Sequence, residues 1–493
     1  MVESSEEKKN YRNSFKTTLL FSGVQIYQIL IRIVRSKFVA MFLGPEGMGI
    51  MSLLHSTTDL ISATTNLGLK TSGVKSVAAA NASNDKERIA RIGEVLRKLI
   101  FLTGLLGMLI CACLAPIWSN MSFGNYDYTW SFVFISVIIL LDQMNNGELT
   151  LLQGMQKKKF LANANVIGQT IGLFVAVPLY YFFRVKAIVW VLVLHSLCSL
   201  IISKCYSRKL DLPKVNISSK ETFTEGGEMI KMGFFLSLQY LLQVLSMYVV
   251  RTFVSKTGSL DDVGLYSAGS TIIKMYVGLV FSAIATDYFP RLAGTTSNTT
   301  LCTSMRQQAE ITILMLAPII VAFIVFIKPV VVILYSERFL PIEDMLYWGM
   351  SAMLIKAMGW ALSFSVLAKL TPKVFFVNEL IAIFNSIAIN ICGYYFWGLT
   401  GFGISLLASN TIYLIQMIIV TRKNFNMHFG FKIWMLFILL SAFVISSLIL
   451  KTIESEILGY VTGGLLLIVT LAYALYELNK RMDLISVIKS KRD

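Results

Sequence analysis

The fold is decided by residues 25–66, which read QIYQILIRIVRSKFVAMFLGPEGMGIMSLLHSTTDLISATTN. Two apolar stretches lie in this segment, each close to the ~20 residues that a helix needs to cross a bilayer. The turn Leu43-Gly44-Pro45-Glu46-Gly47 separates them. We therefore expect two membrane helices joined by a tight turn.

Polar side chains share one face on each of these expected helices, because they recur at spacings of three and four residues. The first helix carries Gln25, Gln28, Arg32 and Arg35, and the second carries Ser52, His55, Asp59, Ser62 and Asn66. A charge near the middle of a bilayer costs at least ~2.5–3.5 kcal/mol, so the shared face indicates helices that line a wet, protein-walled cavity. The alternative is that both arginines snorkel to the outer surface, but snorkelling needs no glutamines on the same face.

The composition is that of a polytopic membrane protein. Of the 493 residues, 55% are hydrophobic and 15% are charged, and the mean hydropathy is +0.68. The apolar run that starts at Thr17 is too long for a cleavable signal peptide, so we expect it to remain as a span. The six cysteines lie mostly inside apolar runs without metal-ligand spacing, which predicts no metal site.

The apolar runs predict an all-α protein with about fourteen transmembrane helices. If the N-terminus is cytoplasmic, roughly 31 of the 44 basic residues face the cytoplasm and about six face the periplasm. This distribution predicts cytoplasmic N- and C-termini, and it argues against a nucleic-acid partner despite a net charge of +16. The amphipathic segment 84–98 is expected to lie on the membrane surface.

An internal repeat divides the chain. Gly49-Ile50-Met51-Ser52 matches Gly264-Leu265-Tyr266-Ser267 at an offset of 264 − 49 = 215 residues. The repeated unit has six expected helices, so both copies start on the same side of the membrane. We expect six-helix lobes at 1–208 and 229–424, a cytoplasmic linker at 209–228, and two further helices with a tail at 425–493. Such lobes commonly surround a central cavity and rock to give alternating access.

Two motifs resemble those of a known family. The run Leu43 to Gly49 resembles the first periplasmic turn of Wzx-type polysaccharide (O-antigen) flippases, and Ile333 to Pro341 resembles their segment between the ninth and tenth spans. These flippases belong to the multidrug/oligosaccharidyl-lipid/polysaccharide exporter superfamily, whose members have two six-helix lobes and often two extra C-terminal helices. The resemblance covers nearly the whole chain.

The resemblance implies a function in polysaccharide biosynthesis. It implies that the protein moves an undecaprenyl-pyrophosphate-linked oligosaccharide, such as an O-antigen unit for lipopolysaccharide, from the cytoplasmic to the periplasmic leaflet of the bacterial inner membrane. Membrane lipids, a polysaccharide polymerase and a chain-length regulator are the implied partners. No cofactor is expected, and protons or sodium ions are the candidate coupling ions.

Roles for individual residues follow from the resemblance and from their chemistry. Cations in the central cavity of relatives are thought to hold the pyrophosphate, which by position carries over to Arg32, Arg35 and Arg251, and less strongly to Lys274 and Lys356. Arginine suits pyrophosphate because it donates hydrogen bonds in pairs. The candidates for binding glycan are Gln25, Gln28, Gln239, Gln243, Asn145, Asn146, Asn385 and Trp360. The candidates for gating or coupling are Asp59, His55, Asp142 and Glu148.

Simpler interpretations exist for several of these residues. Glu148 can equally hydrogen-bond to a neighbouring helix, and His195 is more often a packed histidine than a proton carrier. Among other functions, a cation-coupled multidrug exporter calls for an acidic cavity, whereas basic residues are in excess here. A lipid II flippase uses the same lipid carrier and stays a close alternative. An enzyme is not expected, because the sequence has no nucleotide-binding glycine loop and no metal-ligand cluster.

Overall fold

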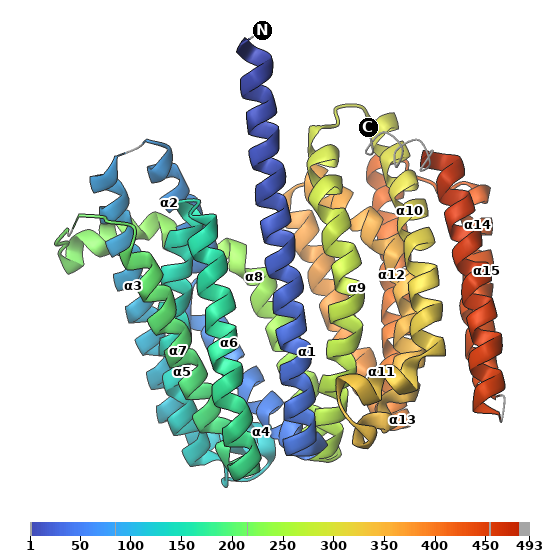
Figure 1. Cartoon of the computed structure of the whole chain (residues 1–493), viewed down its shortest axis with the longest axis horizontal. Helices are drawn as coiled ribbons and strands as arrows, with labels where there is room; N and C mark the ends of the chain where they lie inside the picture. Colours follow the sequence, from blue (N-terminus) through green and yellow to red (C-terminus); the bar gives the residue numbers. More distant parts are fainter. Residues whose placement is uncertain (1, 84, 214, 453–454, 483–493) are drawn as a thin grey trace. The chain divides into compact units, whose positions relative to one another are not determined.

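The computed structural model describes residues 2–83, 85–213, 215–452 and 455–482, with backbone alone for residues 2–26, 219, 235–236, 276–277, 279, 283, 286–287, 289–290, 293, 372, 452 and 482. This part of the chain is all-helical (Figure 1) and multi-spanning, with ten helices that are long and apolar enough to cross a membrane, or eleven if one bent pair is counted. Two of them, Lys158–Arg208 and Lys373–Phe425, have 51 and 53 residues, about twice the length of one span. Their backbones are interrupted at Arg184 (φ 50°) and Gly398 (φ 56°).

The chain forms two compact units, Met1–Val263 and Gly264–Asp493, which we describe separately. The first unit contains α1 (Val2–Thr65), α2 (Leu69–Ala82), α3 (Lys86–Cys113), α4 (Ala115–Phe123), α5 (Thr129–Gly154), α6 (Lys158–Phe183), η1 (Arg184–Ala187), α7 (Ile188–Arg208) and α8 (Ser219–Thr257). Helix α5 packs between α3 and α7, while α8 packs against α1, α2, α3 and α4.

The expected turn after the first apolar stretch is present as a break inside α1. Gly44 has φ 68° and ψ −173°, a backbone conformation that is essentially restricted to glycine. Pro45 follows directly and starts the second half of α1, where its missing N–H and fixed φ are tolerated. The Gly-Pro pair therefore divides α1 into two helical segments, as the sequence predicts.

Helix α8 was not expected to begin where it does. Part of the predicted linker is helical, because a capping box of Ser218 and Glu221 starts α8, which then bends by 54° between Lys220–Phe234 and Ser237–Thr257. Near the bend, Gly233 meets Gly68: a Cβ on Gly68 would lie 2.0 Å from the carbonyl oxygen of Gly233. The two glycines thus let the backbones of α2 and α8 touch.

The amphipathic segment before the third span is the start of α3. Asp85 caps the helix by accepting hydrogen bonds from the backbone N–H groups of Glu87 and Arg88. The apolar face of this segment, including Val95 and Leu96, is buried within the first unit. It therefore packs against protein instead of lying on the membrane surface.

The second unit contains α9 (Leu260–Gly294), α10 (Asn298–Val325), α11 (Ile327–Leu334), η2 (Glu337–Ile342), α12 (Glu343–Lys369), α13 (Pro372–Phe425), α14 (Phe431–Ile449), η3 (Leu450–Thr452) and α15 (Glu456–Met482). Helix α12 packs against α10 and α13, and α10 also contacts α14 and α15. In the segment that carries the second motif, the rings of Tyr335 and Phe339 stack at 5.1 Å and are buried.

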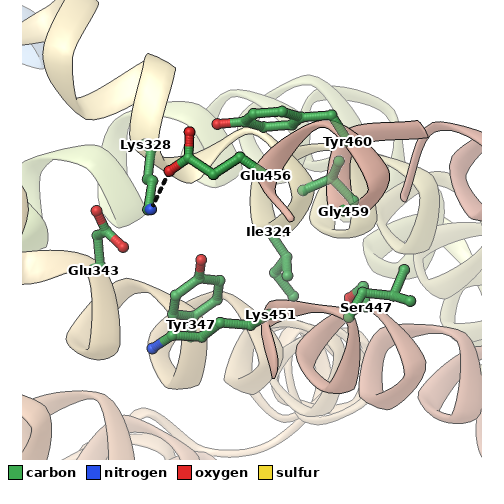
Figure 2. Close-up of a pocket in the computed structure, with 11 residues that line it drawn as sticks. Ile324, Lys328, Glu343, Tyr347, Ser447, Lys451, Glu456, Gly459 and Tyr460 are labelled. Atoms are coloured by element: carbon green, nitrogen blue, oxygen red, sulfur yellow. Dashed lines mark hydrogen bonds and ion pairs between the residues drawn. The ribbon is translucent and has the colours of Figure 1, made fainter. Parts of the chain in front are cut away.

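Ion pairs fasten α14 and α15 to the rest of the second unit. At one end, Lys328 Nζ lies 2.8 Å from Glu456 Oε1 beside a cavity of about 260 Å³ (Figure 2). Lys451, which follows α14, pairs with Asp344 of α12. Near the C-terminal end of α15, Arg481 Nε lies 2.7 Å from Glu310 Oε2 on α10. Helix α15 is therefore tied to its neighbours near both of its ends.

Candidate functional site

A polar cavity of about 430 Å³ lies inside the first unit, between α1, α5 and α7. Five of the residues singled out from the sequence line it, namely Arg35, His55, Asp142, Asn145 and Asn146. Each is half-buried, so its side chain is held by the helices but still reaches the cavity.

Both halves of α1 contribute to this cavity. Arg35 comes from the half before the break at Gly44, and His55 comes from the half after it. Because α1 changes direction at Gly44, two side chains far apart along one helix line the same space. Met51 lies on the same wall, and the hydroxyl of Tyr180 on α6 lies 3.8 Å from its sulfur.

Helix α5 supplies a second polar wall. Asp142, Asn145 and Asn146 share one helix face, because they are separated by three and four residues. A carboxylate and two amides on one face can accept and donate hydrogen bonds to a polar ligand.

Helix α7 completes the cavity with residues that were not predicted from the sequence to line it. His195 was expected to be a packed histidine, yet it lines the cavity together with Ser196 and Ser199. Its Nδ1 is buried and has no hydrogen-bond partner within the described residues. A Cβ on Gly172 of α6 would lie 1.9 Å from this atom, so the missing side chain of Gly172 makes room for the ring. The signal was present in the sequence, because serines recur at helical spacing around His195 in an otherwise apolar run.

The cavity can hold a polar or anionic group. Arg35 and Asp142 are its two formally charged side chains, and amides, imidazoles and hydroxyls line the rest of its polar surface. A guanidinium donates paired hydrogen bonds to a phosphate or carboxylate.

Several predicted residues do not line this cavity. Arg32 and Asp59 are exposed on α1, Gln28 is half-buried, Gln239 and Gln243 are exposed on α8, and Arg251 is half-buried on α8. The side chain of Gln25 lies outside the described residues.

Glu148 is hydrogen-bonded to a neighbouring helix, the contact that the simpler of its two interpretations predicts. Its side chain is buried (6% exposed) and accepts two hydrogen bonds from Arg97 on α3, from Nε to Oε1 at 2.9 Å and from Nη2 to Oε2 at 2.8 Å. This two-point pair joins α5 to α3.

In the second unit, Lys356 and Trp360 lie one turn apart on α12. Lys356 Nζ is 5.6 Å from the ring centroid of Phe281, which is 5.0 Å from the ring of Trp360. Trp360 in turn lies 4.5 Å from the ring of Phe364. The cation thus sits at the edge of an aromatic cluster. Lys274 is exposed on α9, and Asn385 is half-buried on α13.

Comparison with known families identifies a related family. The model of a family described as polysaccharide biosynthesis protein matches residues 14–296. No curated protein matches the chain in sequence.

Solved structures of transporters share the fold. The lipid II flippase MurJ in an inward closed conformation is similar with a TM-score of 0.72 and 13% identity, over 95% of this chain and 100% of that one. An inward-facing multidrug resistance MATE family transporter of the MOP superfamily has a TM-score of 0.63 and 17% identity, over 80% and 94%. A MOP superfamily transporter from Pyrococcus furiosus, described as having a binding pocket of reverse polarity, has a TM-score of 0.55 and 14% identity, over 83% and 94%.

Proposed function

Because the chain belongs to the polysaccharide biosynthesis protein family, we propose that it moves a lipid-linked oligosaccharide across the membrane. The family and the MOP-type fold are those of a transporter and not of an enzyme, which confirms the resemblance to Wzx-type flippases. The proposed substrate is an undecaprenyl-pyrophosphate-linked oligosaccharide, moved from the cytoplasmic to the periplasmic leaflet of a bacterial inner membrane.

The polar cavity of the first unit is the observation that supports this proposal most. A lipid-linked sugar has a pyrophosphate and a glycan that must both be sheltered from the hydrocarbon core, while the polyprenyl tail can stay in lipid. Arg35 supplies paired donors for the pyrophosphate, and Asn145 and Asn146 supply amides for the glycan. Lys356 and Trp360 offer a cation and an aromatic face in the second unit.

We propose that both termini are cytoplasmic. We also propose about fourteen transmembrane spans, in which the helical stretches of 51 and 53 residues each cross the membrane twice. The two six-helix lobes would rock around the substrate, and Asp59, His55 and Asp142 are the proposed coupling groups. Arg32, Arg251 and Lys274 are further candidates for pyrophosphate contact. A polysaccharide polymerase and a chain-length regulator are the proposed partners.

A lipid II flippase is the second candidate, because a protein with that function has the similar fold over nearly the whole chain. A multidrug exporter of cationic compounds fits less well, since the polar cavity places an arginine where such a ligand would be repelled.

The proposal is tested by complementation in a strain that lacks its own surface-polysaccharide flippase. Arg35→Ala should abolish export of the polysaccharide, and Arg35→Lys should restore only part of it, because an ammonium lacks the paired donors. Arg422→Ala, which removes an exposed arginine at the end of α13 and outside both family motifs, serves as the matched control and should export normally.

Full export by Arg35→Ala at equal protein level would exclude this cavity as the pyrophosphate site. A parallel assay in cells depleted of their lipid II flippase distinguishes the two substrates. Rescue of viability there, without polysaccharide export, would assign the chain to lipid II.

A further inference from the structure

A second cavity in the first unit, of about 220 Å³, lies between α3, α5 and α7 and is rich in cations. Arg97, Lys204 and Arg208 line it, together with one carboxylate, that of Glu148. It shares no lining residue with the polar cavity described above. The transport proposal does not use it.

The charges in this cavity are not balanced. The carboxylate of Glu148 is already bound at two points by Arg97, whose Nη1 also lies 3.9 Å from Glu94. Lys204 and Arg208 are exposed at the end of α7, and neither forms an ion pair within 4.0 Å inside the described part of the chain. Two cations therefore remain available to an anionic ligand.

Exposed apolar side chains lead up to the charged residues. On α7, Leu197 (38% exposed) and Ile201 (53%) precede Lys204 and Arg208 at spacings of three and four residues, so all four lie on one face. On α3, Phe101 (43% exposed) follows Arg97 by one turn. In a membrane protein such apolar positions face the acyl chains of lipids, so the charged cavity lies at the end of a lipid-facing surface.

The cavity wall is formed by close helix packing. Gly147 lies on α5 directly against α3, since a Cβ there would be 2.9 Å from Cδ1 of Ile100. Glu148, the residue after Gly147 on α5, pairs at two points with Arg97 on α3 and so holds the same two helices together. The cationic side chains therefore project from helices that pack closely against one another.

We propose that this cavity binds the phosphate of an anionic membrane lipid, whose acyl chains lie along the exposed apolar residues of α3 and α7. Arginine and lysine between membrane helices recognise lipid phosphates in this way. Arg208 provides paired donors and Lys204 a point charge, while Glu148 keeps Arg97 in place. The basic run from Lys204 belongs to the side that the charge distribution assigns to the cytoplasm, where anionic lipids are abundant.

The test measures lipid binding by native mass spectrometry on the purified full chain. Dioleoylphosphatidylglycerol should bind more tightly than dioleoylphosphatidylcholine to the wild type. Lys204→Gln with Arg208→Gln should weaken the phosphatidylglycerol interaction by about fivefold for each cation removed. The matched control, Lys159→Gln with Lys209→Gln, removes the same charge from exposed residues that do not line the cavity and should change the affinity less than about twofold.

Two outcomes would overturn the proposal. If the cavity variant and the control bind phosphatidylglycerol equally, the attraction is that of the whole basic surface. If inorganic phosphate or glycerophosphoglycerol competes as well as the intact lipid, the ligand is a soluble phosphate and not a lipid. A thermal melt of each variant in lipid-free detergent tests whether the substitutions change folding. If the double variant melts at a lower temperature, lipid binding is measured on Lys204→Met alone, because methionine keeps the apolar stem of the lysine and removes only its charge.

Discussion

Arg35 and His55 line one cavity although they lie on opposite sides of the break at Gly44 in α1. Their meeting depends on a single glycine whose backbone no other residue readily adopts. The site of the first unit is therefore tied to the local geometry of one turn.

Gly44→Ala should destabilise the protein and abolish transport. The conformation at φ 68° and ψ −173° costs a residue with a Cβ on the order of 1–3 kcal/mol. A fluorescence melt in detergent and a complementation assay measure the two effects. Gly464→Ala is the control, because a Cβ there has no atom within 4 Å; an unchanged melt for Gly44→Ala would show that the turn tolerates a side chain.

Gly172→Ala should displace the ring of His195, because the new Cβ would lie 1.9 Å from Nδ1. We expect a lower melting temperature, and we expect His195→Ala in the same chain to restore part of the loss by removing the clash. Gly168→Ala on the same helix meets only ordinary contacts at 3.5 Å and should be nearly neutral. Equal melting temperatures for Gly172→Ala with and without His195→Ala would mean that the ring does not occupy this space.

Arg97→Ala should be more damaging than the double variant Arg97→Ala with Glu148→Ala. The single change leaves a buried carboxylate without its two donors, at a cost of roughly 1–3 kcal/mol, whereas the double change removes the unsatisfied group. Solvent screens part of this interaction, because the Arg97 side chain is 38% exposed. Chemical unfolding of the purified variants tests the order, and a double variant at least as unstable as Arg97→Ala alone would contradict it.

Topology can be tested with single cysteines in a chain whose six natural cysteines are replaced. Lys256→Cys should react with an impermeant thiol reagent in intact cells, and Lys159→Cys should react only after lysis. Both side chains are exposed, so accessibility to the reagent is set by the side of the membrane. Labelling of Lys159→Cys in sealed cells would reverse the assigned orientation.

Features that depend on local sequence could be predicted, and features that depend on distant partners could not. The turn at Gly44-Pro45 and the polar face of Asp142, Asn145 and Asn146 follow from backbone preference and helical spacing alone. Five of the predicted site residues consequently line one cavity.

The rest needed the tertiary structure. The role of Glu148 depends on Arg97, which lies on another helix, and the position of His195 depends on the space left by Gly172. The close approach of α2 to α8 also depends on long-range packing, at the contact of Gly68 with Gly233. The early start of α8 is by contrast a local signal, the capping box of Ser218 and Glu221, which the sequence prediction of a linker did not include. The polarity of α1 alone could not separate Arg35, which reaches the cavity, from Arg32, which is exposed.

The ion pairs near both ends of α15 have a mechanical consequence. A helix fastened only at one end can swing away from its neighbours, but α15 is held by Lys328 near its start and by Glu310 near its finish. The two ion pairs therefore brace α15 against α11 through Lys328 and against α10 through Glu310, so a displacement of α10 during a transport cycle has either to break the Arg481–Glu310 pair or to move α15 with it. Shortening the chain before α14 would remove this brace and leave apolar surface of α10 without its cover.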